Sequence, residues 1–288
     1  FGLRERMIMK IKCLVTGHRG YIGSHLYKKL QELGYEVRGI DLKEGSDIIT
    51  DLEKYEDFKP DFIFHLAAIP RVAYSIEYPE EVLENNILST IRILEYARRS
   101  NTRRVIYSGS SSVVGNGDGP TNPYGASKLI PEILCKNYSD VYGLDTVTLR
   151  YFNVYSKDQK AEGPYATAVA NFMQHIRQGK NPFITGDGTQ RRDMLHVSDA
   201  VGANIFAMQF DGSFNGAPFD TATGANISLN EIKEIIKEYH PNVTFDYVEE
   251  RRGDVRVTKA NTEPLKKLGW SVRIDIDSGI HSCFDQPL

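Results

Sequence analysis

The feature that most constrains the fold is a glycine-rich turn that joins the first strand-like segment to the first helix-like segment. A segment at 10–16 that is typical of a buried strand leads into Thr16-Gly17-His18-Arg19-Gly20-Tyr21-Ile22-Gly23, and residues 21–33 then carry apolar side chains at helical spacing before Gly34. Glycines allow a tight turn and close approach of a pyrophosphate, and the helix N-terminus offers free N–H groups. The order strand, turn, helix predicts a dinucleotide-binding βαβ unit.

The same alternation continues through the first half of the chain. We expect strands at 36–41, 61–66, 104–108 and 146–150, and helices at 82–100 and 124–142. Parallel strands require the long right-handed crossovers that such helices supply. The pattern predicts an α/β fold with a Rossmann-type doubly wound parallel sheet that is covered by helices on both faces.

The alternation becomes less regular after about residue 155. Helices are expected at 165–178, 197–208, 228–239 and 262–268, the third of them opening on a capping box. We predict an NAD-binding Rossmann domain over residues 8–155 and a smaller α/β domain, mainly substrate-binding, over residues 156–288. Part of 190–222 is expected to return to the Rossmann sheet. Residues 1–6 are interpreted as a leader before Met7 or Met9.

Composition limits the partners that the chain can have. With 41% hydrophobic residues and a net charge of −3, the chain is typical of a globular protein and has no field that favours nucleic acid or an anionic membrane. It contains no apolar run of the roughly 20 residues that a membrane-spanning helix needs. The three scattered cysteines, Cys13, Cys135 and Cys283, form neither a metal-type pair nor a disulfide framework. We expect a cytoplasmic protein without metal, nucleic-acid or membrane partners.

Asp41 stands at the end of the second expected strand. A carboxylate at this place accepts hydrogen bonds from an adenosine ribose diol and repels a 2′-phosphate, which favours NAD over NADP. The alternative is that Asp41 is only a turn residue. Arg19, in the glycine turn, is expected near the pyrophosphate or in solvent, although it could contact a 2′-phosphate.

Tyr124 and Lys128 lie at the start of the expected helix 124–142, after Asn122 as its cap and Pro123 in its first turn. The i, i+4 spacing places both on one face, where an ammonium would lower the pKa of the phenol. The spacing alone arises easily by chance among 16 tyrosines, so its position after the fourth strand carries the interpretation. That strand ends in Ser108-Gly109-Ser110-Ser111-Ser112, whose hydroxyls either bind a reacting oxygen or form an ordinary turn.

In this order, these segments resemble the NAD-dependent epimerase/dehydratase family of extended short-chain dehydrogenases/reductases. Further signatures of the family run along almost the whole chain, and together they are specific although each alone is weak. They are Asp51-Leu52, His65-Leu66-Ala67-Ala68, Asn86, Arg150-Tyr151-Phe152-Asn153-Val154-Tyr155, Gly186-Asp187-Gly188-Thr189-Gln190-Arg191-Arg192-Asp193, Arg251-Arg252-Gly253-Asp254 and Leu268-Gly269-Trp270.

The resemblance implies roles for individual residues. Ser110 would be the hydroxyl partner, Tyr124 the acid/base and Lys128 its activator. NAD would be bound by Gly17, Gly20, Tyr21, Ile22, Asp41, Asp51, Leu52, Leu66, Ala67, Ala68, Asn86, Ser108, Tyr124, Lys128 and Tyr151. A nucleotide-diphosphate sugar would be bound by Ser110, Ser111, Asn153, Arg192, Arg251 and Asp254, because guanidinium groups suit phosphate oxygens. The family also implies a homodimer that pairs through 82–100 and 124–142.

The residues after Ser110 distinguish between reactions within the family. Dehydratases of the family carry Asp-Glu directly after the hydroxyl residue and decarboxylases tend to carry a Glu nearby, whereas this chain has Ser111 and Ser112. The resemblance is therefore greatest to UDP-glucose and UDP-N-acetylglucosamine 4-epimerases, which act through a transient 4-keto sugar. The alternatives are another nucleotide-sugar oxidoreductase, either a 4-ketoreductase or a dehydratase, and a non-catalytic NAD-binding sensor.

Three departures from the family pattern surround the expected site. The segment from Ser110 to Tyr124 is shorter than usual, Val114 stands where the family commonly has Tyr, and Ser156 stands where it has Gly. We expect these changes to alter the substrate or the mobility of the site without removing a catalytic group.

Overall fold

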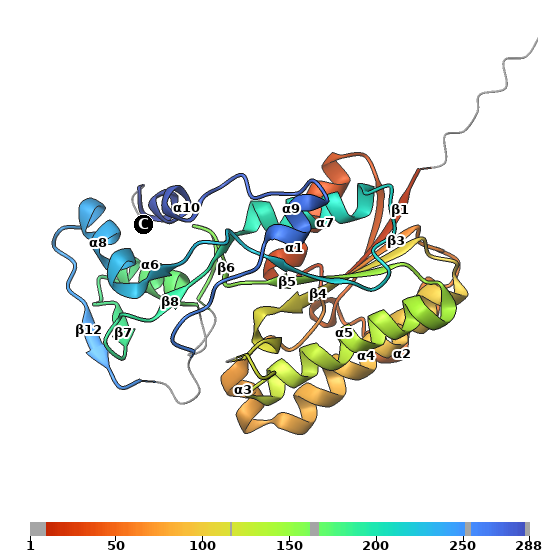
Figure 1. Ribbon diagram of the computed structural model, residues 1–288, viewed down its shortest axis with the longest axis horizontal. Coiled ribbons are helices and arrows are strands. Elements are labelled where there is room, and N and C mark those ends of the chain that lie inside the picture. Colours follow the sequence, from red (N-terminus) through yellow and green to blue (C-terminus); the bar gives the residue numbers. More distant parts are fainter. Residues whose placement is uncertain (1–9, 116, 162–166, 251–254, 286–288) are drawn as a thin grey trace, which may run out of the picture.

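The computed structural model describes residues 10–115, 117–161, 167–250 and 255–285 (Figure 1). Its centre is a sheet of six strands in the order β10-β5-β4-β3-β1-β2, and every neighbouring pair is parallel. The strands are β1 (Lys12–Thr16), β2 (Glu36–Ile40), β3 (Phe62–His65), β4 (Arg104–Ser110), β5 (Thr146–Tyr151) and β10 (Pro218–Thr221). This is the predicted Rossmann-type sheet.

The side chains on the two faces of the sheet pack into two separate hydrophobic cores, because successive side chains of a strand point to opposite faces. In β1, Cys13 and Val15 join the core beneath α1 (Tyr21–Glu32) and α7 (Val197–Gln209). Leu14, between them, joins the core beneath α4 (Pro79–Arg99) and α5 (Pro123–Tyr142). Figure 1 shows the α4–α5 pair on one side of the sheet and α1 and α7 on the other, so the sheet is doubly wound.

The connections place a switch point beside β1. The chain moves from β1 outwards to β2, then crosses back to β3 on the other side of β1. Ligands of such sheets bind in the crevice outside the carboxyl ends of the strands at the point where the order reverses. The turn after β1 and the loop after β3 therefore mark the expected binding edge.

A smaller lobe carries its own core and lies to the left in Figure 1. Helices α6 (Ala168–Arg177), α8 (Leu229–Tyr239) and α10 (Ile276–Phe284) enclose side chains such as Phe172 and Ile232. Between these helices run short paired strands: β6 (Val154–Tyr155) with β9 (Leu195–His196), β7 (Phe183–Thr185) with β12 (Asp246–Val248), and β8 (Arg191–Arg192) with β11 (Ile227–Ser228).

The remaining described elements are short. They are η1 (Leu42–Glu44), α2 (Ile48–Asp51), η2 (Leu52–Tyr55), α3 (Val72–Glu77), η3 (Ser111–Val113) and α9 (Glu263–Lys267). Helix α4 begins at Pro79 rather than at the predicted 82, because proline suits a first helical turn and Glu80 and Glu81 favour the positive end of the helix dipole. None of the described helices combines the length and the apolar character that crossing a membrane requires.

Candidate active site

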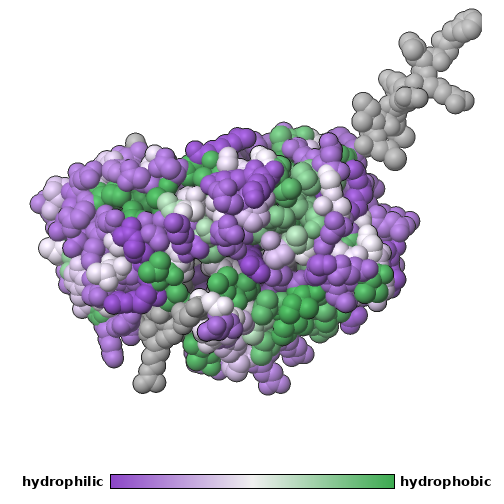
Figure 2. Space-filling model, in the orientation of Figure 1, coloured by the Kyte–Doolittle hydropathy of each residue, from purple (hydrophilic) through white to green (hydrophobic). Residues whose placement is uncertain are grey.

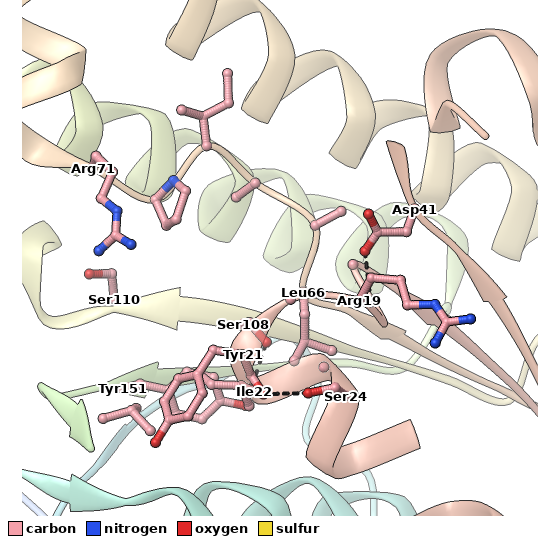
Figure 3. A pocket seen from close by; sticks show the side chains of 18 of the residues that line it. Arg19, Tyr21, Ile22, Ser24, Asp41, Leu66, Arg71, Ser108, Ser110 and Tyr151 are labelled. Carbon is pink, nitrogen blue, oxygen red and sulfur yellow. Dashed lines mark hydrogen bonds between the residues drawn. The ribbon is translucent and has the colours of Figure 1, made fainter. Parts of the chain in front are cut away.

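A cavity of about 890 Å³ opens along the carboxyl edge of the sheet, beside the switch point. Its walls come from the turn after β1, the end of β2, the loop after β3, the serines after β4, the start of α5 and the segment 151–160. Figure 3 shows side chains from these elements converging on one space. The volume lies in the range typical of small-molecule and cofactor sites.

The turn after β1 requires glycine for steric reasons. Gly17 has a φ of +69°, and a Cβ on it would lie 2.8 Å from the backbone nitrogen of Ala67. A Cβ on Gly23 would lie 2.1 Å from the carbonyl oxygen of Gly17. Helix α1 then begins after Gly20 with no side-chain cap and no acidic residue in its first turn. Its positive end faces the cavity, so the site fits the pyrophosphate of a dinucleotide, with Tyr21 and Ile22 also in the wall.

Asp41 lines the cavity at the end of β2. Its carboxylate accepts hydrogen bonds from the backbone N–H groups of Arg19 (2.8 Å) and Lys43 (2.9 Å), which fix its position at the rim. The guanidinium of Arg19 pairs with Glu44, and the ring of His18 approaches the same carboxylate at 2.9 Å. Arg19 therefore already has an acidic partner at the adenosine end of the expected NAD site.

Two residues expected near the adenine do not line the cavity. Asp51 pairs with Lys54 at 2.7 Å and accepts the N–H of Asp47 at 2.9 Å, and these contacts lower the pKa of its carboxyl. Leu52 is buried in the core beneath α4. One helical turn earlier, Asp47 and Ile48 line the wall, so α2 presents its beginning rather than its end to the cavity.

The loop after β3 supplies Leu66, Ala67 and Ala68 to the wall, as expected. Asn86 in α4 lies behind this loop and does not itself line the cavity. Its side chain accepts the N–H of Ile69 (2.8 Å), donates to the carbonyl of Ile69 (3.2 Å) and donates to the hydroxyl of Ser127 (2.9 Å). Asn86 thus ties the loop to α4 and α5.

Tyr124 and Ser110 meet at the other end of the cavity. Asn122 caps α5 by accepting the N–H of Gly125 at 2.9 Å, and Tyr124 is half-buried in the first turn. Burial raises the pKa of the Tyr124 phenol, while a hydrogen bond with the Ser110 side chain and the positive charge of Arg71 act in the opposite direction. The net pKa stays above the usual value for tyrosine, so the phenolate form depends on these two neighbours.

Lys128 is directed at the end of β4. Its ammonium donates to the carbonyl of Ser108 at 3.0 Å, and burial lowers its pKa to about 8. The Ser108 hydroxyl in turn donates to the Tyr151 hydroxyl at 3.5 Å, which also accepts a hydrogen bond from Asn204 at 2.6 Å. The structure thus brings Ser108, Ser110, Tyr124, Lys128 and Tyr151 together in one wall.

The residues expected to bind the substrate are only partly brought together. Ser111 and Asn153 line the cavity, and Asn153 donates to the carbonyl of Asp193 at 2.7 Å. Arg192 lies outside the lining and donates to the carbonyls of Arg191 (3.0 Å) and Arg256 (3.3 Å). Arg251 and Asp254 lie outside the described residues.

Several wall residues were not identified from the sequence, among them Arg71 and the segment 158–160. Ser156 does not line the cavity, but it hydrogen-bonds to the hydroxyl of the wall residue Tyr21 at 2.5 Å. Arg71 directly follows a loop that leaves the carboxyl end of a central strand, and this position in the sequence could have indicated that Arg71 lies at the binding edge of the sheet. The contact of Ser156 depends on tertiary packing between α1 and the end of β6, which no local pattern reveals.

Comparison with known proteins identifies the family. The model of the NAD dependent epimerase/dehydratase family matches residues 13–217. UDP-glucose 4-epimerase of Mycolicibacterium smegmatis is 30% identical over 94% of this chain and 96% of its own. UDP-N-acetyl-alpha-D-glucosaminuronate decarboxylase of Bacillus cytotoxicus is 33% identical over 80% of both chains. The solved structure of UDP-glucose 4-epimerase from Thermotoga maritima with UDP-glucose superimposes with a TM-score of 0.88, at 29% identity, covering 96% of this chain and 98% of that one. With a glycine turn, an acidic strand end and a serine–tyrosine–lysine wall in one cavity, the chain belongs to the NAD dependent epimerase/dehydratase family and is an NAD-dependent enzyme.

Proposed function

We propose that this enzyme is a nucleotide-diphosphate-sugar 4-epimerase, with UDP-hexoses or UDP-N-acetylhexosamines as the expected class of substrate. The observation that carries the proposal is the end of the cavity that Ser110, Tyr124 and Lys128 line together. The residues that follow Ser110 are serines, so this wall offers an acid/base phenol without the carboxyl pair that elimination of water uses. Relatives named as 4-epimerases support the proposal.

The proposed cofactor site uses the residues that fit a dinucleotide. The first turn of α1 would hold the pyrophosphate, Asp41 the adenosine ribose, and the wall of Ser108, Lys128 and Tyr151 the end nearest the reaction. When bound, NAD supplies reversible hydride transfer. We also propose two domains: residues 8–155 bind the cofactor and residues 156–288 mainly bind the substrate. Strand β10 belongs to the first domain through its pairing with β5.

The chain's own residues account for the proton transfers. The Tyr124 phenolate takes the proton from the 4-hydroxyl of the sugar, and the Ser110 hydroxyl hydrogen-bonds to the same oxygen. Asn153, Arg192 and Arg251 hold the diphosphate while the 4-keto sugar turns about its diphosphate linkage, and Asp254 contacts another part of the nucleotide sugar. Tyr124 then returns the proton to the 4-oxygen of the sugar, whose C4 now has the opposite configuration.

The experiment that tests the proposal uses no added reductant. The purified enzyme is incubated separately with UDP-glucose, UDP-N-acetylglucosamine and UDP-glucuronate, and the sugars are followed by NMR. A 4-epimerase forms the matching galacto-sugar, and Tyr124→Phe lowers the rate by about 10²- to 10⁴-fold because the acid/base is lost. Tyr142→Phe, at the exposed end of the same helix, is the matched control.

The same experiment separates the alternatives. A 4-ketoreductase would leave all three sugars unchanged and would require added reduced cofactor, and a dehydratase would form a deoxy-keto sugar. A decarboxylase, the activity named for one relative, would convert UDP-glucuronate to a pentose with release of carbon dioxide. A sensor would bind NAD and leave every sugar unchanged. Any of these results contradicts 4-epimerisation.

We further propose a homodimer that pairs through α4 and α5. Ile133 and Val141 are exposed on α5, and Figure 2 shows hydrophobic surface over this face. Light scattering of the purified protein tests the proposal, and a monomeric mass would contradict it. The three free, buried cysteines also support a reducing compartment such as the cytoplasm.

A further inference from the structure

The segment that follows β6 is bound to α1 by a cluster of four polar side chains. Tyr21 and His25 stand one helical turn apart on α1, and their rings meet edge to face with 5.6 Å between the centroids. The Tyr21 hydroxyl hydrogen-bonds to the hydroxyl of Ser156 at 2.5 Å. Ser156 donates to one carboxylate oxygen of Asp158, and Nε2 of His25 lies 3.1 Å from the other. These four side chains form one connected cluster, which we call the α1 clasp.

The donors and acceptors of the α1 clasp match one another. A serine hydroxyl has one hydrogen and an ionised carboxylate only accepts, so the hydroxyl that Ser156 donates to Asp158 must accept from Tyr21. Burial opposes ionisation of Asp158, but the Ser156 hydroxyl and His25 help to hold the pKa of its carboxyl below the usual value. The imidazole of His25 can supply an N–H to this carboxylate in its neutral as well as its protonated form.

The same segment is also bound to the smaller lobe. Arg177 of α6 donates to the carbonyl of Lys157 at 3.0 Å, and Thr167, the N-cap of α6, donates to the side chain of Gln159 at 2.9 Å. A turn closes the segment, because the N–H of Gln159 donates to the carbonyl of Ser156 at 3.2 Å. This turn therefore connects α1, which packs on the sheet, with α6 in the smaller lobe (Figure 1).

The α1 clasp lies at the phosphate end of the cofactor site. Tyr21 and His25 line the cavity from the start of α1, and Asp158 lines it from the segment after β6. The first turn of α1 is the part of the wall that fits the pyrophosphate, so contacts that bind the segment to this helix limit how far the wall can open there. Ser156 supplies the link best shielded from water, since it is 3% exposed, whereas the side chain of Asp158 is 57% exposed.

We propose that the α1 clasp retains NAD in the cavity between turnovers, with His25, Ser156 and Asp158 as positioning residues. Opening the wall at α1 breaks the buried link between Tyr21 and Ser156 and the exposed link between His25 and Asp158. Ser156 stands where the family pattern has Gly, which carries no hydroxyl, so the α1 clasp depends on a residue at which this chain departs from that pattern. The inference rests on the NAD site and not on 4-epimerisation.

The test measures how fast the loaded enzyme releases NAD when no sugar is present. Exchange of bound NAD for isotope-labelled NAD gives the release rate for wild type, Ser156→Ala, Ser156→Gly, Asp158→Ala and Asp158→Glu. Ser156→Ala removes the hydroxyl without the backbone freedom that glycine adds. Asp277→Ala is the matched control, because Asp277 is an exposed aspartate of α10 that pairs with His281 at 3.8 Å and lies outside the described lining. Urea denaturation shows whether each variant folds.

Ser156→Ala should release NAD about 5- to 100-fold faster than wild type, the effect of two lost hydrogen bonds, and Ser156→Gly at least as fast. Asp158→Ala should accelerate release about 2- to 10-fold, because its carboxylate is more exposed, and Asp158→Glu should recover part of that change. Asp277→Ala should stay within about twofold of wild type. A wild-type release rate in Ser156→Ala, or equal acceleration in Asp277→Ala, would overturn the inference. If Ser156→Ala does not fold, a wild-type rate in Asp158→Ala overturns it.

A double variant tests whether His25 and Asp158 act through one contact. His25→Ala with Asp158→Ala should release NAD within about twofold of the rate of Asp158→Ala alone, because residues that share a contact are not additive. Additive effects would mean that His25 acts on NAD without Asp158, which contradicts its place in the α1 clasp.

Failure of the inference can be distinguished from failure of the proposed function, because release is measured without sugar. If NAD release is unchanged in the variants while the galacto-sugar still forms, the 4-epimerase stands and the α1 clasp is wrong. If release accelerates as expected but wild type forms no galacto-sugar, the α1 clasp stands and 4-epimerisation is wrong.

Discussion

Tyr124 and Lys128 lie one helical turn apart on α5, and burial favours the neutral form of both. It raises the pKa of the phenol and lowers that of the ammonium to about 8. Because Lys128 donates to the Ser108 carbonyl, the neighbours that stabilise the phenolate in this structure are Ser110 and Arg71. At the scale of single residues, the reactivity of Tyr124 is therefore set by its hydroxyl partner and by the loop cation.

Removing the Ser110 hydroxyl should move the pH dependence of the reaction. The hydrogen bond from Ser110 lowers the pKa of Tyr124, so Ser110→Ala raises it and shifts the alkaline rise of kcat/KM to higher pH. The measurement is kcat/KM for epimerisation against pH. Ser111→Ala is the control, since Ser111 lines the cavity but is not among the groups that shift the Tyr124 pKa. A shift to lower pH, or equal shifts in both variants, would contradict the prediction.

Lys128→Met should show a pH-dependent effect on stability. An unfolded lysine titrates near 10.4, whereas folded Lys128 titrates near 8, so between these values the unfolded chain binds more protons. The wild-type free energy of unfolding therefore rises with pH across this window, relative to the variant, by on the order of 3 kcal/mol. Below pH 8 the full penalty of charging the buried lysine is present. Urea denaturation at pH 7 and pH 10 measures the difference.

Lys136→Met replaces an exposed lysine on the same helix, so it controls for the loss of a positive charge and of the aliphatic part of the side chain. Lys128→Met also removes packing and the hydrogen bond to Ser108, which do not depend on pH across this range. Their loss changes the free energy of unfolding by the same amount at every pH and leaves its slope against pH unchanged. A difference between wild type and Lys128→Met that stays constant from pH 7 to pH 10 would contradict the lowered pKa.

At the scale of elements, the junction of β1 and α1 depends on Gly17. Gly17→Ala forces a side chain into left-handed backbone and places its Cβ 2.8 Å from the backbone of Ala67. Gly34 also has a positive φ, but a Cβ there meets nothing within 4 Å. Gly34→Ala should cost about 1–2 kcal/mol of unfolding free energy from backbone strain alone, and Gly17→Ala clearly more, with loss of NAD binding. Equal losses in urea denaturation would show that the contact with Ala67 does not matter.

The first half of the fold could be predicted because its elements are long and periodic. The stripe of Leu26 and Leu30 buries one face of α1, and the apolar run of β1 is typical of a strand covered on both faces. In the second half, β6, β8, β9 and β11 have two residues each, which is too short for any periodicity. Helix α10, also not predicted, packs Ile280 and Phe284 into the core of the smaller lobe.

The candidate site could be predicted where its chemistry is local to one motif. Tyr124 and Ser110 follow directly from a helix start and a strand end, and both line the cavity. Asn86 and Asp51 were assigned to the cofactor by resemblance, whereas their side chains hold neighbouring backbone at Ile69 and Asp47. Arg71 shows the opposite case, because its importance depends on contacts between a loop and two helices that are far apart in the sequence.

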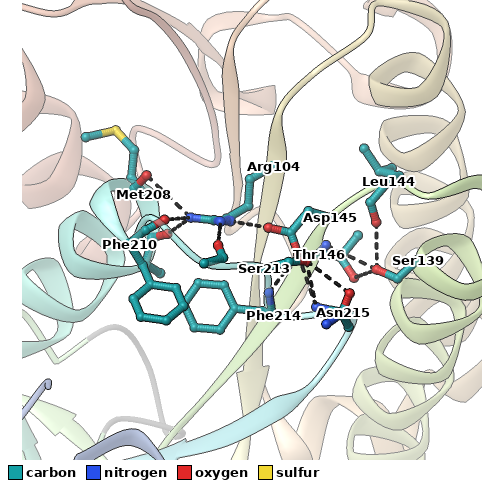
Figure 4. A network of polar contacts seen from close by, with 12 residues as sticks. Arg104, Ser139, Leu144, Asp145, Thr146, Met208, Phe210, Ser213, Phe214 and Asn215 are labelled. Carbon is teal, nitrogen blue, oxygen red and sulfur yellow. Dashed lines mark hydrogen bonds and ion pairs between the residues drawn. The ribbon is translucent and has the colours of Figure 1, made fainter. Parts of the chain in front are cut away.

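At the scale of the whole molecule, the chain leaves the sheet after β5, builds part of the smaller lobe, and returns through α7 and β10. Arg104, at the start of β4, fixes this return, as Figure 4 shows. Its buried guanidinium donates to the carbonyls of Ala207 (2.5 Å), Phe210 (3.0 Å) and Gly212, and pairs with Asp145 at 2.5 Å. One side chain thus binds the backbone carbonyls at the end of α7 and in the turn that follows it.

Arg104→Met should therefore destabilise the protein without changing the chemistry. The substitution leaves the carboxylate of Asp145 and several carbonyls without their cation, and breaking a buried pair in this way costs about 3–5 kcal/mol. The remaining hydrogen bonds to Asp145 from Ser213, Phe214 and Asn215 place the expected loss at the lower end. Because Arg104 lies at the amino end of β4 and the cavity lies at its carboxyl end, kcat per folded molecule should stay within about twofold, a change of less than 1 kcal/mol in the barrier.

Urea denaturation measures the loss of stability and epimerisation rates measure kcat, with Arg103→Gln, at the exposed neighbouring residue, as the control. Equal stability of the two variants, or a loss of kcat without a loss of stability, would contradict the assignment of Arg104 to the returning chain.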